Sequence, residues 1–227
     1  MKILVVDVGG NKIKVLLSGL KAPLKVPSGP RLTAARMAAD VRKVLAGARY
    51  DRVSIGYPGP VRGNRPLEEP VNLGRGWVRF DYERAFGKPV RMINDAAMQA
   101  LGSYCGGRML FLGLGTGLGS ALVLDGLVQP LEMAHLPYRN GKTYEDFLGK
   151  RGLDRVGKKR WRGLVFEIVP RLRHAFQVDE VVVGGGNSKQ LKSVPPATRL
   201  GDNANAFLGG FRLWQGPPRA RPGARRR

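Results

Sequence analysis

Short apolar runs alternate with glycine-rich turns along the chain, and this pattern predicts a mixed α/β protein. The first run, residues 2–8, is rich in β-branched residues, meets a Gly-Gly pair and returns over 13–17 with alternating polarity. Such a run, turn and return predict a β-hairpin. A second run at 109–114 meets the glycine turn 115–119 and returns at 120–124, so the same device is expected twice.

Apolar residues at helical spacing predict helices between and after these hairpins. A third apolar run, EVVVGGG at 180–186, again ends in glycines. Pro170 predicts a kink inside the third helix, and His174 in the same helix is expected to be a packing residue. The expected helices are 32–45, 96–105, 164–176 and 203–214, and further strands are expected at 51–56 and 90–93.

The charge is strongly positive, and it changes the picture of what the protein can bind. Thirty-nine Lys and Arg against 17 Asp and Glu give a formal charge of +22. Such a charge indicates affinity for a polyanion, although an arginine bias of the genome would produce the same composition. The final segment, 215–227, holds five arginines with Pro, Gly and Ala, which predicts a disordered basic tail.

One cysteine, Cys105, can form neither an internal disulfide nor a cysteine-rich zinc site. A reducing cytoplasm is therefore the expected location. No segment approaches the roughly 18 apolar residues that a membrane span requires.

The first glycine turn gathers groups that suit phosphate. A carboxylate, free backbone donors and ammonium groups lie within eight residues, which is the chemistry of a magnesium and phosphate corner. Asp7 would hold the magnesium ion through water. An ordinary tight turn with solvated lysines is the alternative. The residues of this corner are Asp7, Gly9, Gly10, Asn11, Lys12 and Lys14.

Asp95 lies where a predicted strand meets a predicted helix. In that place an aspartate is often only a helix N-cap. It can also be a catalytic base, because α/β proteins bind ligands at the carboxyl ends of strands. The glycines 184–186 suit the ribose or α-phosphate of a nucleotide above a helix N-terminus.

Two further clusters have chemical interest. Glu132, His135, Glu145 and Asp146 suit a metal or sugar hydroxyl groups, or form an inert surface loop. The run 158–162 is the densest internal basic patch and includes Trp161. It could grip polyphosphate or nucleic acid, or be a solvated helix start; its cations are Lys158, Lys159, Arg160 and Arg162.

Taken together, these motifs resemble the ROK family of sugar kinases, within the actin and hexokinase superfamily. The resemblance covers about residues 1 to 214 and is greatest for the zinc-free branch that includes polyphosphate-dependent glucokinases. The motifs, in order, are DVGGNKIK at 7–14, GYPGPV at 56–61, VNL at 71–73 with Trp77, NDA at 94–96, LGTGLGSAL at 114–122, EMAH at 132–135, YEDF at 144–147 and VVVGGGNSK at 181–189.

This resemblance implies a two-lobed actin/hexokinase-like ATPase fold with an interlobe cleft. The N-terminal lobe would comprise 1–108 with about 201–214, and the C-terminal lobe 109–200. The resemblance implies transfer of a phosphoryl group from ATP or polyphosphate to the 6-hydroxyl of a hexose, with glucose as the first candidate. It also implies Mg²⁺ as cofactor and no zinc. A homodimer is also implied.

The resemblance also assigns roles to individual residues. Asp95 matches the catalytic base, and Asp7 to Lys14 match the first phosphate motif. The implied sugar ligands are Asn72, Asn94, Asp95, Glu132, His135 and Glu145, the second phosphate motif is Gly115, Thr116, Gly117 and Gly119, and the nucleotide-side glycines are Gly184, Gly185 and Gly186.

Some positions depart from the family pattern. Asn11 stands where Thr or Ser is common, Ala134 replaces a glycine, and Glu69-Pro70-Val71 precedes Asn72 where small or hydroxylated residues are common. The alternative function is a non-catalytic protein that senses a sugar or binds a polyanion. The presence of the base, the donor turns and the carboxylates favours the enzyme.

Overall fold

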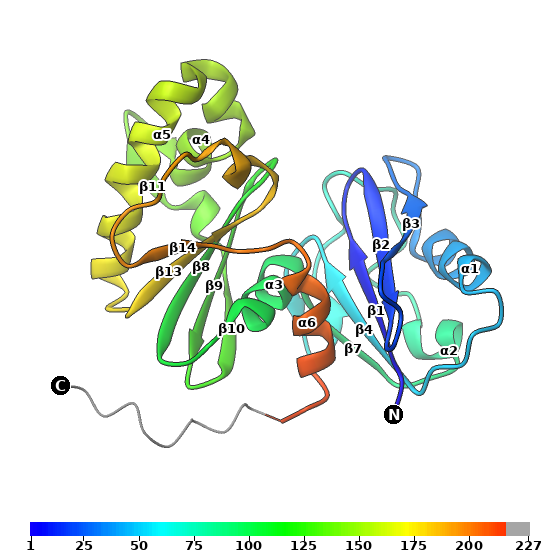
Figure 1. Ribbon diagram of the computed structural model, residues 1–227. Coiled ribbons are helices and arrows are strands. Elements are labelled where there is room, and N and C mark those ends of the chain that lie inside the picture. The colour runs from blue at the N-terminus through cyan, green and yellow to red at the C-terminus, as the bar shows by residue number, and fades with distance from the viewer. Residues whose placement is uncertain (217–227) are drawn as a thin grey trace.

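The computed structural model describes residues 1–216 and contains two five-stranded sheets, separated by a pair of helices (Figure 1). The predicted basic tail lies outside the described residues, except for positions 215 and 216. No helix in 1–216 is long and apolar enough to cross a membrane.

The first sheet has the order β3-β2-β1-β4-β7. Its hairpin strands β1, β2 and β3 are antiparallel, and β1, β4 and β7 are parallel. The predicted first hairpin and the predicted strands at 51–56 and 90–93 are thereby confirmed. The bounds are β1 Ile3–Val8, β2 Lys12–Leu17, β3 Leu24–Pro27, β4 Arg52–Tyr57 and β7 Val90–Asn94.

The second sheet repeats this topology with the order β10-β9-β8-β13-β14. Strands β8, β9 and β10 are antiparallel, whereas β8, β13 and β14 are parallel. The second predicted hairpin is therefore also present, and the two glycine turns occupy equivalent places in the two sheets. The bounds are β8 Arg108–Leu114, β9 Leu118–Leu124, β10 Leu127–Leu131, β13 Glu180–Gly184 and β14 Thr198–Leu200.

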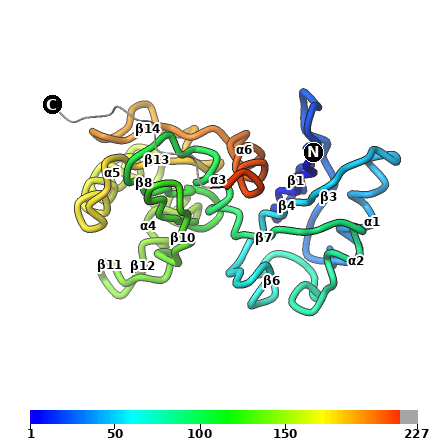
Figure 2. Tube along the Cα trace, turned by 90° about the horizontal axis from the view of Figure 1, so that it is seen from below, coloured from blue at the N-terminus to red at the C-terminus, as the bar shows by residue number. Residues whose placement is uncertain are grey.

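Helices cover the sheets and separate them. In Figures 1 and 2, α3 and α6 lie between the sheets, α1 and α2 lie by the first sheet, and α4 and α5 lie by the second. Apolar clusters join these layers, since α1 packs on the first sheet and α5 on the second. The bounds are α1 Ala34–Val44, α2 Tyr82–Phe86, α3 Asp95–Ser103, α4 Tyr144–Leu148, α5 Lys150–Ala175 and α6 Asn205–Arg212, with short helices η1 Met133–His135 and η2 Gly186–Gln190 and small hairpins β5 Val61–Arg62 with β6 Arg65–Pro66 and β11 Pro137–Arg139 with β12 Lys142–Thr143.

Helices α3 and α6 contact each other closely at glycine residues. A Cβ at Gly102 would lie 1.7 Å from the carbonyl oxygen of Asn205, and a Cβ at Gly209 would lie 1.7 Å from that of Met98. Ser54 Oγ donates to the carbonyl oxygen of Gly210 at 2.6 Å, which attaches α6 to β4. The last helix thus packs against the first sheet, as the sequence predicts.

Helix α5 differs from its prediction in three ways. It begins well before residue 164, and its non-helical residue is Gly157, with φ of 75°, rather than Pro170. Glycine adopts this conformation without a Cβ clash, so the helix is interrupted at Gly157. His174 is exposed, so the expected packing role was wrong.

Candidate active site

The turn between β1 and β2 holds a carboxylate and an ammonium group side by side. The strand register pairs Asp7 with Lys14, and Lys14 Nζ lies 3.0 Å from Asp7 Oδ2. The Gly9 N–H donates to the carbonyl oxygen of Lys12, and a Cβ at Gly9 would lie 2.8 Å from that oxygen. The turn therefore needs glycine at position 9, and it leaves Asn11 and Lys12 exposed at its tip.

The loop that carries Asn72 reaches this first turn. A Cβ at Gly10 would lie 3.4 Å from the Cβ of Asn72, so the two backbones approach closely. Glu69 fixes the loop, because its carboxylate accepts hydrogen bonds from the N–H groups of Trp77 and Val78. The departure at Glu69 thus has a structural explanation, which the sequence analysis missed.

The second turn, between β8 and β9, is held by a carboxylate. Gly115 N donates to the carbonyl oxygen of Gly117, and Leu118 N donates to Glu145 Oε2 at 3.0 Å. A Cβ at Gly117 would lie 2.4 Å from the same carboxylate oxygen, so only glycine leaves room for it. Glu145, assigned to the sugar by resemblance, therefore has one oxygen on the phosphate turn, while Thr116 is exposed at its tip.

Asn94 and Asp95 have different hydrogen-bonding roles at the start of α3. Asn94 is the N-cap: its Oδ1 accepts from Ala97 N at 3.1 Å, and its Nδ2 donates to the Gly59 carbonyl at 3.2 Å. Asp95 is the first residue of the helix, and its Oδ1 accepts from Ala96 N at 2.7 Å. Because Asn94 supplies the cap, capping does not account for Asp95.

The surroundings of Asp95 favour the protonated carboxyl group. Burial raises its pKa to about 7, and the charges of Asp7 and Glu132 act in the same direction. A Cβ at Gly119 would lie 2.7 Å from the Cβ of Ala96, so the start of α3 packs against β9 directly after the second turn. Asp95 thus lies near both glycine turns and near the loop that carries Glu132, with a pKa suited to accepting a proton near neutrality.

The loop that carries Glu132 is attached to β9 by Ser120. Its hydroxyl donates to the Leu131 carbonyl at 2.9 Å and accepts from Met133 N at 3.2 Å. Sequence analysis did not select Ser120; the available signal was a polar residue inside the apolar strand. The serine fixes the loop on both sides of Glu132.

Glu132 and His135 lie on the exposed part of this loop. Partial burial raises the pKa of Glu132, His135 lowers it, and the carboxylates of Glu68 and Glu145 raise it further. The electrostatic influence of Glu68, which lies in the Asn72 loop, indicates that loops of the first and second sheets face each other here.

The three nucleotide-side glycines have different environments. A Cβ at Gly184 would lie 2.8 Å from the Phe111 ring, and a Cβ at Gly185 would lie 2.5 Å from the Leu114 carbonyl oxygen, at a φ of 81°. Gly186, by contrast, is exposed and open. Asn187 Nδ2 donates to the Gly115 carbonyl at 2.7 Å, so this junction is tied directly to the second turn.

The basic patch lies on α5. Lys158, Lys159 and Arg160 are exposed, whereas Arg162 is half-buried and donates to the Gln190 carbonyl. Trp161 is fully buried, and its Nε1 donates to the Leu148 carbonyl. The idea that Trp161 contacts an anion is therefore wrong, because the ring packs in the core.

No group of three or more His, Cys, Asp or Glu side chains within 1–216 could hold a metal ion by itself. A magnesium ion needs oxygen ligands and commonly takes them from one or two carboxylates together with substrate phosphates. Asp7, next to the phosphate turn, fits that arrangement. A site assembled jointly with the donor is consistent with the residues present.

The class of protein follows from solved structures. No protein-family model matches the chain. A ROK family glucokinase from Streptomyces griseus, in complex with glucose and AMPPNP, superposes with a TM-score of 0.72 at 20% identity, covering 94% of this chain and 99% of that one. The ROK hexokinase from Thermus thermophilus gives a TM-score of 0.63 at 26% identity, covering 99% and 94%. The chain has the two-lobed α/β fold of the ROK sugar kinases, which confirms the expected fold and resemblance.

The chain is also similar to two named polyphosphate-dependent kinases. The chain is 25% identical over 217 residues to the polyphosphate glucokinase of Mycobacterium tuberculosis, covering 84% of this chain and 80% of the relative. The inorganic polyphosphate/ATP-glucomannokinase from Arthrobacter sp. strain KM superposes with a TM-score of 0.73 at 22% identity, covering 92% and 96%. The chain is thus similar to phosphotransferases of the hexokinase and glucokinase type.

Proposed function

We propose that this protein is a sugar kinase that transfers a phosphoryl group from ATP or inorganic polyphosphate to the 6-hydroxyl of a hexose, with glucose as the first candidate. The observation that carries the proposal is the position of Asp95. Asp95 is under the electrostatic influence of Asp7 at the first glycine turn, its neighbour Ala96 packs against Gly119 at the second, and its pKa is raised to about 7. A sugar hydroxyl is a poor nucleophile until a base accepts its proton.

In the proposed reaction, Asp95 accepts the proton of the hydroxyl while the sugar oxygen bonds to the terminal phosphorus. The bond from that phosphorus to the leaving phosphate oxygen breaks in the same displacement. Backbone N–H groups at the tips of the two turns, at residues 10–11 and 116–117, and the Lys14 ammonium would offset charge on the phosphate oxygens. Magnesium bound through Asp7 would neutralise further charge.

The sugar would lie on the other side of Asp95. We assign Asn72, Asn94, Glu132 and His135 to its hydroxyl groups, and Glu145 to both the sugar and the second turn. The lobes would be 1–108 with 201–214 and 109–200, and a homodimer stays a prediction. Support for glucose comes from the names of the relatives, which include glucokinases and a glucomannokinase.

Asp95→Asn tests the proposal. The amide keeps an oxygen for Ala96 N but cannot accept the proton, so kcat should fall about 10²- to 10⁴-fold. Formation of hexose 6-phosphate is followed in a coupled assay with each donor, and glucose binding is followed by calorimetry. The control is Asp125→Asn, at an exposed turn position with φ of 50° that asparagine tolerates. Unchanged turnover in Asp95→Asn would reject the assigned base.

A sensor without catalysis is the second candidate. The fold also matches a ROK family transcriptional regulator, with a TM-score of 0.68 at 16% identity, and the charge of +22 suits a polyanion. Under this alternative, glucose would bind without turnover with either donor. DNA binding that weakens steeply with salt and exceeds the sugar affinity would favour it.

A further inference from the structure

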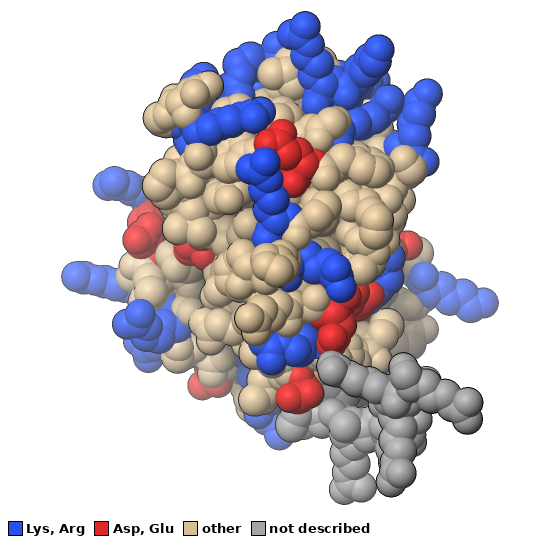
Figure 3. All heavy atoms as spheres, turned by 90° about the vertical axis from the view of Figure 1, so that its left-hand side faces the viewer, with Lys and Arg blue, Asp and Glu red and all other residues tan. Residues whose placement is uncertain are grey.

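The N-terminal half of α5 carries a dense group of exposed cations. Figure 3 shows Lys and Arg side chains gathered over the top of the molecule, where this part of α5 lies. Lys150 is paired with Asp154. In contrast, Lys158, Lys159, Arg160 and Arg162 form none of the ion pairs found within 1–216. Their charge is therefore available to an external anion.

Helix geometry divides these cations into two sets. Residues four apart lie on the same face, so Lys158 and Arg162 are neighbours. Arg162 donates to the Gln190 carbonyl, which places this face beside η2. Arg160 lies two positions from each of them and therefore points to another side of the helix.

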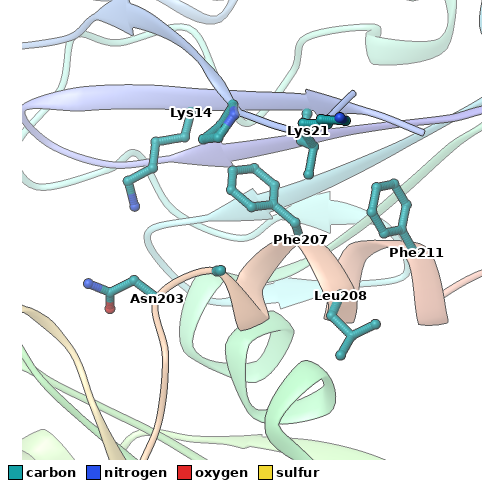
Figure 4. A pocket seen from close by; sticks show the side chains of 9 residues that line it. Lys14, Lys21, Asn203, Phe207, Leu208 and Phe211 are labelled. Carbon is teal, nitrogen blue, oxygen red and sulfur yellow. The ribbon is translucent and has the colours of Figure 1, made fainter. Parts of the chain in front are cut away.

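From η2 the positive charge continues to a cavity. Lys189, next to Gln190, is exposed and lines a cavity of about 620 Å³ with Asn203 and four other residues. Asn203 also lines the neighbouring pocket that includes Lys14, and Figure 4 shows both side chains there. Lys14 is the partner of Asp7 in the first turn. Asn203 thus lies between Lys14 and the cavity of Lys189, and the bond from Arg162 to Gln190 joins η2 to α5.

The cavity lining includes one carboxylate, Asp202. Its Oδ1 accepts a hydrogen bond from Ala204 N at 2.8 Å, so part of its charge is offset by its own backbone. The remaining polar groups are the Ser188 hydroxyl, the Lys189 ammonium and the Asn203 amide. The Lys189 ammonium and the Asn203 amide can donate to phosphate oxygens, whereas the Ser188 hydroxyl donates to the Gly185 carbonyl at 2.8 Å.

We propose that Lys189, Arg162 and Lys158 form a track that holds the distal phosphates of a linear polyphosphate while its terminal phosphate lies at the two glycine turns. This inference rests on the proposed function and deepens it. ATP ends in a nucleoside after three phosphates, so it has no distal phosphates to offer Lys158. The track therefore adds affinity only for long phosphate chains.

The test compares two charge-reversal variants of equal net charge. Lys158→Glu reverses an exposed track cation, and Arg160→Glu reverses an exposed cation of the same helix that points to another side. For a long polyphosphate, the track variant should raise KM about tenfold or more, whereas the control should change KM about twofold or less. KM for ATP and for tripolyphosphate should stay within about twofold in both variants.

Direct binding separates this inference from the proposed function. Fluorescently labelled long polyphosphate is titrated with each variant at several salt concentrations. Weaker polyphosphate binding by the track variant alone, with a shallower salt dependence, supports the track. This holds even if neither donor gives turnover. Absence of turnover would defeat the proposed function and leave the track standing. Equal weakening in both variants, or none in the track variant, overturns the track.

Discussion

The raised pKa of Asp95 makes a prediction about stability that is separate from catalysis. In the folded protein the carboxyl group keeps its proton up to about pH 7, against a value of 3.8 for the unperturbed group. Between these two values the folded state binds more protons than the unfolded state. The free energy of unfolding therefore falls as pH rises from about 4 to 7, and this contribution is constant above pH 7.

The size of the effect follows from the two pKa values. They differ by about 3, and each pKa unit corresponds to about 1.36 kcal/mol, so ionised Asp95 costs the fold at most about 4 kcal/mol. Asp95→Asn removes this cost and keeps an oxygen for Ala96 N. The variant should match the wild type near pH 4 and exceed its stability by up to about 4 kcal/mol at pH 8.

The assay is urea unfolding of both proteins at several pH values from 4 to 8. Titrating groups that do not interact with Asp95 are shared by the two proteins and cancel in the difference between them, whereas Asp7 and Glu132 interact with its charge. Asp125→Asn, which changes an exposed carboxylate, should show a difference near zero at every pH. A flat difference between Asp95→Asn and wild type across this range would show that Asp95 is not held protonated by its surroundings.

Two further predictions concern packing and support. Gly209→Ala places a methyl group against the Met98 carbonyl, where the Cβ would lie 1.7 Å from the oxygen. It should lower the free energy of unfolding by about 3 kcal/mol or more, measured by urea titration. An unchanged unfolding midpoint would contradict the close contact between α3 and α6. Ser120→Ala leaves Met133 N without its hydrogen-bond acceptor and should lower the free energy of unfolding by about 1–3 kcal/mol. It should also raise KM for glucose more than KM for ATP. Equal effects on both KM values would argue against a role in sugar binding for the loop that carries Glu132.

Local patterns were sufficient to predict the glycine hairpins and the junction at Asp95. A run of β-branched residues, a glycine turn and a return form a structure from neighbours in the chain, so sequence spacing describes it well. The strand that ends at Asn94 and the helix that begins at Asp95 are likewise a local arrangement.

Contacts between distant segments were not predictable in this way. Asn187 bonds to Gly115, Asn72 approaches Gly10, and Gly102 meets α6, and each contact depends on how the layers pack. Trp161 is an instructive error, because its cationic neighbours suggested a binding surface. Its spacing from Leu164, Val165 and Ile168 is that of a buried helical face.

The lack of side chains where α3 crosses α6 determines how closely the two sheets approach each other. Gly102 lies on the same helix as Asp95, and it lets α6 approach until backbone meets backbone. Any side chain at this crossing would act as a spacer and move one sheet away from the other. The separation of the two glycine turns is thus decided at a contact that involves neither turn.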